Sequence, residues 1–280
     1  MSALFTAHHV AVGGVELFYT DWGPRDAPPV VMSHGLARTG RDFHPLAAAL
    51  ADRWRVVCYD TIGRGLSQWS ATPERDYCYV RYGEIAAALC DALGFASVRW
   101  VGTSMGGALG MTLAAGLMRT RISHLVVNDI GPELAQSAVD RILGYVGKPP
   151  ALGSVAEVEA YLRTVYKPYG FLPDSQWREM TLSSVRRRDD GRWTLHYDPR
   201  ITAQFERPRE EWEFWPAYER IAARTLLLRG AQSDLLTPDV ARRMTECGPR
   251  ARLVTVEGCG HAPALNMPDQ IETVARFLAE

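Results

Sequence analysis

Apolar residues occur along this chain in two kinds of run, which predict two kinds of secondary structure. Short continuous runs predict buried strands at residues 30–33, 55–59, 98–101 and 122–128. Between them lie longer runs in which apolar residues recur every three or four positions, and these predict helices at residues 43–50, 79–93 and 108–119. Strands that alternate with helices predict right-handed crossovers and a mostly parallel sheet.

The two ends of the chain extend this pattern, and its middle interrupts it. Alternating runs at residues 7–12 and 15–22, separated by Gly13 and Gly14, predict a hairpin that forms an antiparallel edge. After residue 130 the sequence is helical, aromatic and charged, until strands at 225–229 and 252–256 and helices at 238–247 and 268–278 resume the alternation. We therefore predict an α/β core domain of residues 1–130 and 216–280, with an eight-stranded, mostly parallel sheet. A helical cap at residues 131–215 is inserted after the sixth strand.

The composition of the 280 residues narrows the classes of ligand and compartment. A formal net charge of −1, with 22% charged residues, predicts neither a nucleic-acid nor a membrane-surface partner. Residues 1–10 lack a basic start followed by an apolar stretch, so we expect a cytoplasmic protein. Five cysteines without C-x-x-C spacing indicate reduced thiols rather than a disulfide framework or a zinc site. No glycine pattern implies a cofactor, and the oligomeric state stays open, a homodimer included.

The strongest chemical signal is the sequence G-T-S-M-G at residues 102–106, between a predicted strand and a predicted helix. A serine on such a tight turn needs glycine two positions before and two after it, because larger residues would collide. Ser104 is therefore our candidate covalent nucleophile. The following helix adds the free N–H groups of its first turn, which favour negative charge near Ser104. A glycine-rich turn around a buried serine is the alternative.

A serine hydroxyl needs a histidine base, and that base needs a carboxylate to orient it. His261 follows the last predicted strand in a glycine-bounded loop, and Asp234 follows the strand before it. The carboxyl ends of parallel strands share one crevice, so Ser104, Asp234 and His261 can meet there.

The order Ser, Asp, His resembles that of capped, Ser-nucleophile proteins of the α/β-hydrolase fold, over nearly the whole chain. Residues 33–36, S-H-G-L, resemble the H-G-x loop of this family, which implies that the backbone N–H groups of Leu36 and Met105 hold an oxyanion. Residues 60–67, D-T-I-G-R-G-L-S, are similar to the family's D-x-x-G-x-G-x-S turn, for which we expect a structural role. Some members draw the acid from the end of the sixth strand, which makes Asp129 the alternative to Asp234.

The predicted reaction is hydrolysis of carboxylic esters of small to medium hydrophobic acyl groups, through an acyl-enzyme on Ser104. The insertion is rich in aromatic residues and predicts an apolar roof over the site. We assign substrate contacts to His34, Gly35, Tyr145 and Trp177, although a structural role also accounts for His34. The residues R-R-R at 186–188 could bind a substrate carboxylate, but consecutive residues on a helix point around it, which favours a solvated face.

Several other activities share this set of residues. Dehalogenases and epoxide hydrolases of the family use an aspartate where this chain has Ser104, which argues against both. Carbon–carbon bond hydrolases commonly carry a tryptophan at the position of Ala262. Enol-lactonases, cofactor-free haloperoxidases and thioesterases stay open as alternatives. From another class, the fold can serve as a ligand receptor without turnover, which tight ligand retention without ester hydrolysis would reveal.

Overall fold

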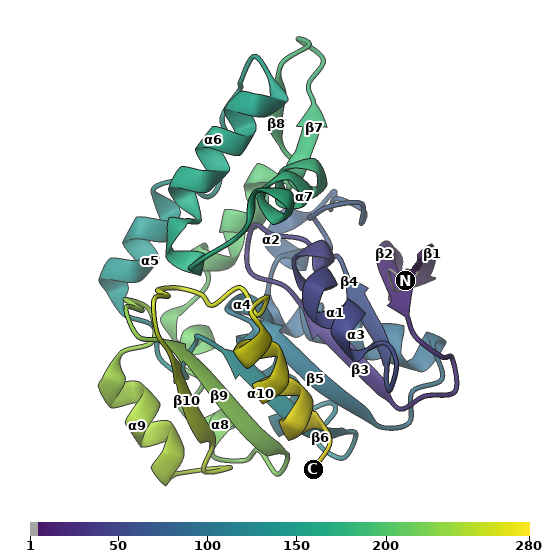
Figure 1. The fold of residues 1–280 in the computed structure, drawn as a ribbon, viewed down its shortest axis with the longest axis vertical. Helices are drawn as coiled ribbons and strands as arrows, with labels where there is room; N and C mark the ends of the chain where they lie inside the picture. Colours follow the sequence, from purple (N-terminus) through teal and green to yellow (C-terminus); the bar gives the residue numbers. More distant parts are fainter. Residues whose placement is uncertain (1–4) are drawn as a thin grey trace.

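The computed structural model describes residues 5–280, and a twisted sheet of eight strands lies at its centre (Figure 1). From edge to edge the strands are β1 (Phe5–Val12), β2 (Val15–Trp22), β4 (Arg55–Tyr59), β3 (Pro29–Ser33), β5 (Val98–Thr103), β6 (Ile122–Asn128), β9 (Arg224–Gly230) and β10 (Arg252–Val256). Strand β2 runs antiparallel to both of its neighbours, whereas the other neighbouring pairs are parallel. The predicted sheet and its N-terminal hairpin edge are confirmed.

Helices cover both faces of the sheet because side chains alternate between the faces along each strand. One face packs against α1 (His44–Leu50) and α10 (Pro268–Leu278). The other face packs against α3 (Tyr79–Ala92), α4 (Met105–Ala115), α8 (Trp215–Tyr218) and α9 (Pro238–Glu246), and the short α2 (Pro73–Asp76) precedes α3. Helix α4 begins at Met105, three residues before its predicted start, because the chain enters the helix directly from the turn at Ser104.

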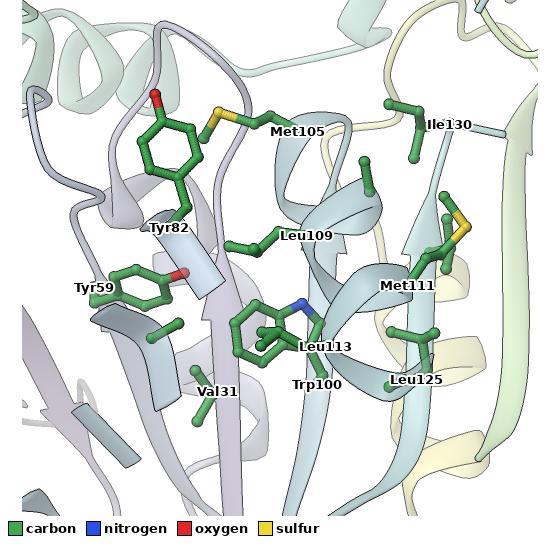
Figure 2. Packing of buried hydrophobic residues seen from close by; sticks show 14 of the residues in the cluster. Val31, Tyr59, Tyr82, Trp100, Met105, Leu109, Met111, Leu113, Leu125 and Ile130 are labelled. Atoms are coloured by element: carbon green, nitrogen blue, oxygen red, sulfur yellow. The ribbon is translucent and has the colours of Figure 1, made fainter. Parts of the chain in front are cut away.

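Helix α4 is held firmly against β5, which matters because Ser104 lies between these two elements. Figure 2 shows Trp100 of β5 beside Leu109 and Leu113 of α4, and all three side chains are buried. The Trp100 indole also donates a hydrogen bond of 3.0 Å to the Gly106 carbonyl oxygen. A side chain at Gly110 would place its Cβ 2.5 Å from the Trp100 ring, so the close packing requires glycine there.

Most of the elements between β6 and α8 form a separate group at one end of the molecule (Figure 1). They comprise α5 (Gln136–Leu143), α6 (Val155–Val165), α7 (Asp174–Ser184), the hairpin of β7 (Val185–Arg187) and β8 (Trp193–Leu195), and the 3-10 turns η2 (Lys167–Tyr169), η3 (Pro199–Glu206) and η4 (Arg209–Trp212). A further 3-10 turn, η1 (Gly40–Phe43), precedes α1. The insertion is thus mainly helical but contains a hairpin that the sequence pattern did not predict.

The three consecutive arginines of the insertion lie in this hairpin, so the prediction of a helix there is wrong. Arg186 and Arg187 belong to β7, where their guanidinium groups lie over the rings of Trp69 and Trp193 at 4.9 and 5.4 Å. Within residues 5–280, no helix combines the length and apolar character needed to cross a bilayer.

Candidate active site

Ser104 adopts the strained backbone conformation that its sequence context predicts. Its φ of 52° and ψ of −116° are rare for a residue with a side chain, and such strain commonly marks a functional turn. A Cβ at Gly102 would lie 2.1 Å from the Gly106 carbonyl oxygen, and one at Gly106 would lie 1.9 Å from the Ser33 carbonyl oxygen. The two glycines therefore let β5 turn into α4 with the Ser104 side chain at the apex.

His261 joins Ser104 to a carboxylate. Its Nε2 lies 2.9 Å from the Ser104 Oγ, and its Nδ1 lies 2.8 Å from an Asp129 carboxylate oxygen. The His261 side chain is 10% exposed and the Asp129 side chain is fully buried. This geometry lets the imidazole accept the serine proton at Nε2 while Nδ1–H donates to Asp129.

The Asp129 carboxylate has hydrogen-bond donors on both oxygens. Its Oδ1 accepts from the Gly230 N–H at 2.8 Å, and its Oδ2 accepts from the Ser233 hydroxyl at 2.6 Å as well as from His261. A buried carboxylate is stable only when donors of this kind replace its hydration. The same contacts attach the loop after β9 to the end of β6.

Asp234 lies elsewhere, and the prediction that it orients His261 is wrong. Its two oxygens accept hydrogen bonds of 2.6 and 2.9 Å from the Arg141 guanidinium, and its side chain is 47% exposed. Partial burial alone would raise the pKa of Asp234, but hydrogen bonding and attraction to Arg141 lower that pKa below its usual value. Asp129, the alternative, occupies the position beside the histidine.

The loop after β3 lies next to Ser104 and is anchored by His34. The His34 ring is buried, with Nδ1 2.7 Å from the Gly35 carbonyl oxygen and Nε2 2.9 Å from the Thr61 N–H. Burial lowers the pKa of His34 to about 3, so the ring is neutral and accepts the Thr61 hydrogen bond. His34 therefore holds the loop in place.

Arg64 is a buried contributor to this region that sequence reasoning missed. Its guanidinium donates to the Leu36 carbonyl oxygen at 2.8 Å and to the Met105 sulfur at 3.4 Å, and thus contacts the two residues predicted to supply the oxyanion donors. It also donates to the Ile62 carbonyl oxygen and to the Tyr82 hydroxyl. The G-R-G sequence of the turn was the available signal, because an arginine between two glycines on a buried turn needs several acceptors.

Two cavities adjoin the loop after β3. A cavity of about 30 Å³, called here the Ser104 cavity, is lined by Ser104, His261 and residues of the insertion that include Tyr145 and Tyr166. A second cavity of about 140 Å³, the side cavity, extends toward α1 and α7. Gly35 and Tyr169 line both cavities.

The four predicted substrate-contact residues are distributed unevenly between these cavities. Gly35 and Tyr145 line the Ser104 cavity, whereas His34 lines only the side cavity. Trp177 lines neither of them: it is 6% exposed and packs inside the insertion, with the Arg163 guanidinium 5.4 Å from its ring centre. The assignment of Trp177 to substrate binding is therefore wrong, and its apolar pattern belongs to the core of the insertion.

Comparisons with known proteins agree on one fold. A family model described as alpha/beta hydrolase fold matches residues 28–268. The chain is 39% identical over 269 residues to 3-hydroxybutyrate-oligomer hydrolase from Cupriavidus necator, covering 92% of this chain and 91% of that protein. It is 26% identical over 258 residues to 2-(acetamidomethylene)succinate hydrolase from Mesorhizobium japonicum, covering 92% and 89%. The crystal structure of an alpha/beta hydrolase from Novosphingobium aromaticivorans matches with a TM-score of 0.88 at 32% identity, covering 100% of this chain and 99% of that one.

Proposed function

Because this chain belongs to the α/β hydrolase fold family and is a hydrolase, we propose that it cleaves the ester bonds of short 3-hydroxybutyrate oligomers. The observation that carries the proposal is the chain of hydrogen bonds from Ser104 through His261 to the buried Asp129, at 2.9 and 2.8 Å. The 39% identity to an oligomer hydrolase over 92% of the chain supports this substrate class.

The first half of the reaction forms an acyl-enzyme. Ser104 Oγ attacks the ester carbonyl carbon while His261 Nε2 accepts the hydroxyl proton, and Asp129 stabilises the resulting imidazolium. Collapse of the tetrahedral intermediate breaks the ester C–O bond, and His261 returns its proton to the leaving alcohol. In the second half, water attacks the acyl group with His261 again as base, which releases the acid and restores Ser104.

The oxyanion of each tetrahedral state is held, in this proposal, by the backbone N–H groups of Leu36 and Met105. Within residues 5–280 neither N–H donates to another group, so both are available to a ligand. Met105 is the first residue of α4, where the helix dipole also favours negative charge. Loss of one such donor costs about 3 to 4 kcal/mol of transition-state stabilisation.

Residues 131–215 act as the cap of the site in this proposal. Tyr145 and Tyr166, both in the insertion, line the Ser104 cavity together with Ser104 and His261. Aromatic walls and limited space suit a short acyl unit such as 3-hydroxybutyryl better than a long chain.

The decisive experiment compares the protein with its Ser104→Ala variant on the dimer and trimer of 3-hydroxybutyrate. Loss of the nucleophile should lower kcat at least about a thousandfold, as for other serine-triad variants. An enol-lactone, a thioester and a dienone-type ketone belong in the same substrate panel, because the alternative activities share the site. Near-normal oligomer hydrolysis by Ser104→Ala, or a clear preference for a substrate outside the ester class, contradicts the proposal.

A further inference from the structure

The Ser104 cavity carries only one sign of charge on its walls. Apart from His261, the ionisable side chains that line it are two arginines and several tyrosines, and no aspartate or glutamate is among its described lining residues. Such a wall favours a substrate with a negative charge. The two arginines, Arg38 and Arg141, differ in how completely the protein itself occupies their guanidinium groups.

Arg38 is already fully engaged by the protein. Its Nε and Nη2 donate to Asp42 at 2.8 and 2.6 Å, and its Nη1 donates to Ser184 at 2.8 Å. The side chain is 2% exposed, and its guanidinium also lies over the Tyr166 ring. Arg38 therefore connects the loop after β3 to α7 and has no free edge for a ligand.

Arg141 differs in exposure and in the place of its partner. It projects from α5 of the insertion, is 39% exposed, and binds Asp234 in the loop between β9 and α9 through Nε and Nη2. Its Nη1 takes no part in this pair. Ion pairs at this level of exposure contribute little to stability, so Arg141 can exchange one carboxylate for another at small cost.

The size of the cavity supports such an exchange. The Ser104 cavity has a volume of about 30 Å³, room for roughly two water molecules, so an ester longer than a short acyl unit needs additional room beside the insertion. Arg141 moves with the insertion, whereas Asp234 belongs to the loop after β9, which Asp129 attaches to β6. Movement of the insertion away from the sheet would separate the pair and leave the Arg141 guanidinium unpaired beside the Ser104 cavity.

We propose that Arg141 binds the free terminal carboxylate of the substrate, so that the enzyme selects short oligomers with an ionised end close to the ester that is cleaved. This inference rests on the proposed function, and it names Arg141 as the residue that recognises the terminal carboxylate of the oligomer. A bidentate guanidinium–carboxylate contact supplies both the affinity and the orientation.

The test uses two substrates that differ only in charge: the 3-hydroxybutyrate dimer, and the same dimer with its terminal carboxylate replaced by a carboxamide. We expect the unmodified enzyme to prefer the acid. Arg141→Gln should lower kcat/KM for the acid at least tenfold, mainly through KM, and should change kcat/KM for the amide less than twofold. Asp234→Asn should retain the preference for the acid, because it leaves the guanidinium in place.

Arg163→Gln is the matched control. Arg163 also lies in the insertion, is 37% exposed and forms ion pairs with Glu159 and Asp174, but it does not line the Ser104 cavity. Its loss should leave the ratio of acid to amide hydrolysis unchanged. The proposal is overturned if Arg141→Gln lowers kcat/KM equally for the acid and the amide and Asp234→Asn does the same. In that case the ion pair only holds the insertion in place.

Failure of the proposed function gives a different result. If the unmodified enzyme hydrolyses neither dimer, the oligomer activity is refuted, and calorimetry then tests Arg141 by itself. Ser104→Ala should bind the acid dimer at least tenfold more tightly than the Ser104→Ala, Arg141→Gln double variant does. Equal affinities of these two variants would refute the role of Arg141.

Discussion

Replacing Asp129 by asparagine should inactivate the enzyme by fixing the wrong tautomer of His261. One carboxylate oxygen of Asp129 accepts from the Gly230 N–H, and the other faces the Ser233 hydroxyl and His261. An asparagine here would keep its carbonyl oxygen toward Gly230, because that backbone donor needs an acceptor. The asparagine NH₂ group then points at His261 Nδ1. Because Nδ1 must accept this hydrogen bond, it carries no proton, and the imidazole proton lies on Nε2 instead. In that form Nε2 cannot accept the proton of Ser104.

The expected loss follows from this change of role. An asparagine in place of the triad aspartate of serine proteases lowers kcat about 10⁴-fold, which corresponds to about 5.5 kcal/mol of activation free energy. Asp234→Asn, in contrast, removes an ion pair whose partners are 39% and 47% exposed, and pairs of this kind contribute about 0 to 1 kcal/mol of stability. We expect its kcat on a neutral ester to change less than about threefold.

The assay is steady-state hydrolysis of p-nitrophenyl butyrate at pH 7.5 by the two asparagine variants, with thermal unfolding measured on both. Because Asp129 also holds the loop after β9, its variant should melt at a lower temperature, and activity is compared well below that transition. Asp129→Asn with more than one tenth of the normal kcat would refute the assignment of the acid. Loss of a thousandfold or more in Asp234→Asn would refute it as well.

Three further predictions concern the groups around the site. Arg64→Met should lower kcat by about ten- to a hundredfold with little change in KM, because the loop after β3, proposed to hold the oxyanion, and the start of α4 lose a shared donor. The affinity for a transition-state analogue should fall in parallel, and an unchanged kcat would contradict this prediction. Gly106→Ala should yield no folded protein on expression, because the new methyl group would lie 1.9 Å from a backbone oxygen, and a normal circular-dichroism melt would refute the argument. Burial lowers the pKa of His34 to about 3 and that of His44 to about 4, so between pH 6 and 4 the unfolded chain binds two protons that the folded chain does not. Burial raises the pKa of Asp60 to about 6, so the folded chain binds one proton there that the unfolded chain does not. These three groups together should lower the free energy of unfolding by about 1.4 kcal/mol for each pH unit between pH 6 and 4, as denaturant titrations can measure. Burial also lowers the pKa values of His124 and His196, which makes the fall steeper.

The sheet could be predicted from the sequence because its strands are buried on both faces. Continuous apolar runs identify such strands, and the predicted ranges 55–59, 122–128 and 252–256 match β4, β6 and β10 to the residue. The insertion was harder to predict, since its residues pack against one another and against the rim of the sheet. The hairpin of β7 and β8 contains three arginines. Two of their guanidinium groups stack on the rings of Trp69 and Trp193, and such contacts leave no periodic pattern in the sequence.

The motifs did not predict the role of Arg64, because that role depends on contacts between distant parts of the chain. Arg64 reaches Leu36, 28 residues earlier, and Met105, 41 residues later, and its significance depends on both contacts together. The local motifs predicted Ser104 and His261 as candidates because the geometry of a strand-to-helix turn and of a glycine-bounded loop is encoded within a few residues, and the structure places the two side chains 2.9 Å apart.

The position of each candidate acid relative to its strand explains why the structure brings Asp129, and not Asp234, to the histidine. Asp129 is the first residue after β6, the strand beside β5, which leads into the candidate nucleophile Ser104. The Asp129 N–H donates to the Leu228 carbonyl oxygen of β9 at 2.8 Å. The carboxylate is therefore held at the rim of the sheet, where the strand ends meet. Asp234 comes only after the loop has left β9 at Gly230, and by then the chain has moved outward to meet Arg141. In this chain, the residue directly at the strand end therefore reaches the histidine, and the residue farther along the loop after β9 contacts the insertion.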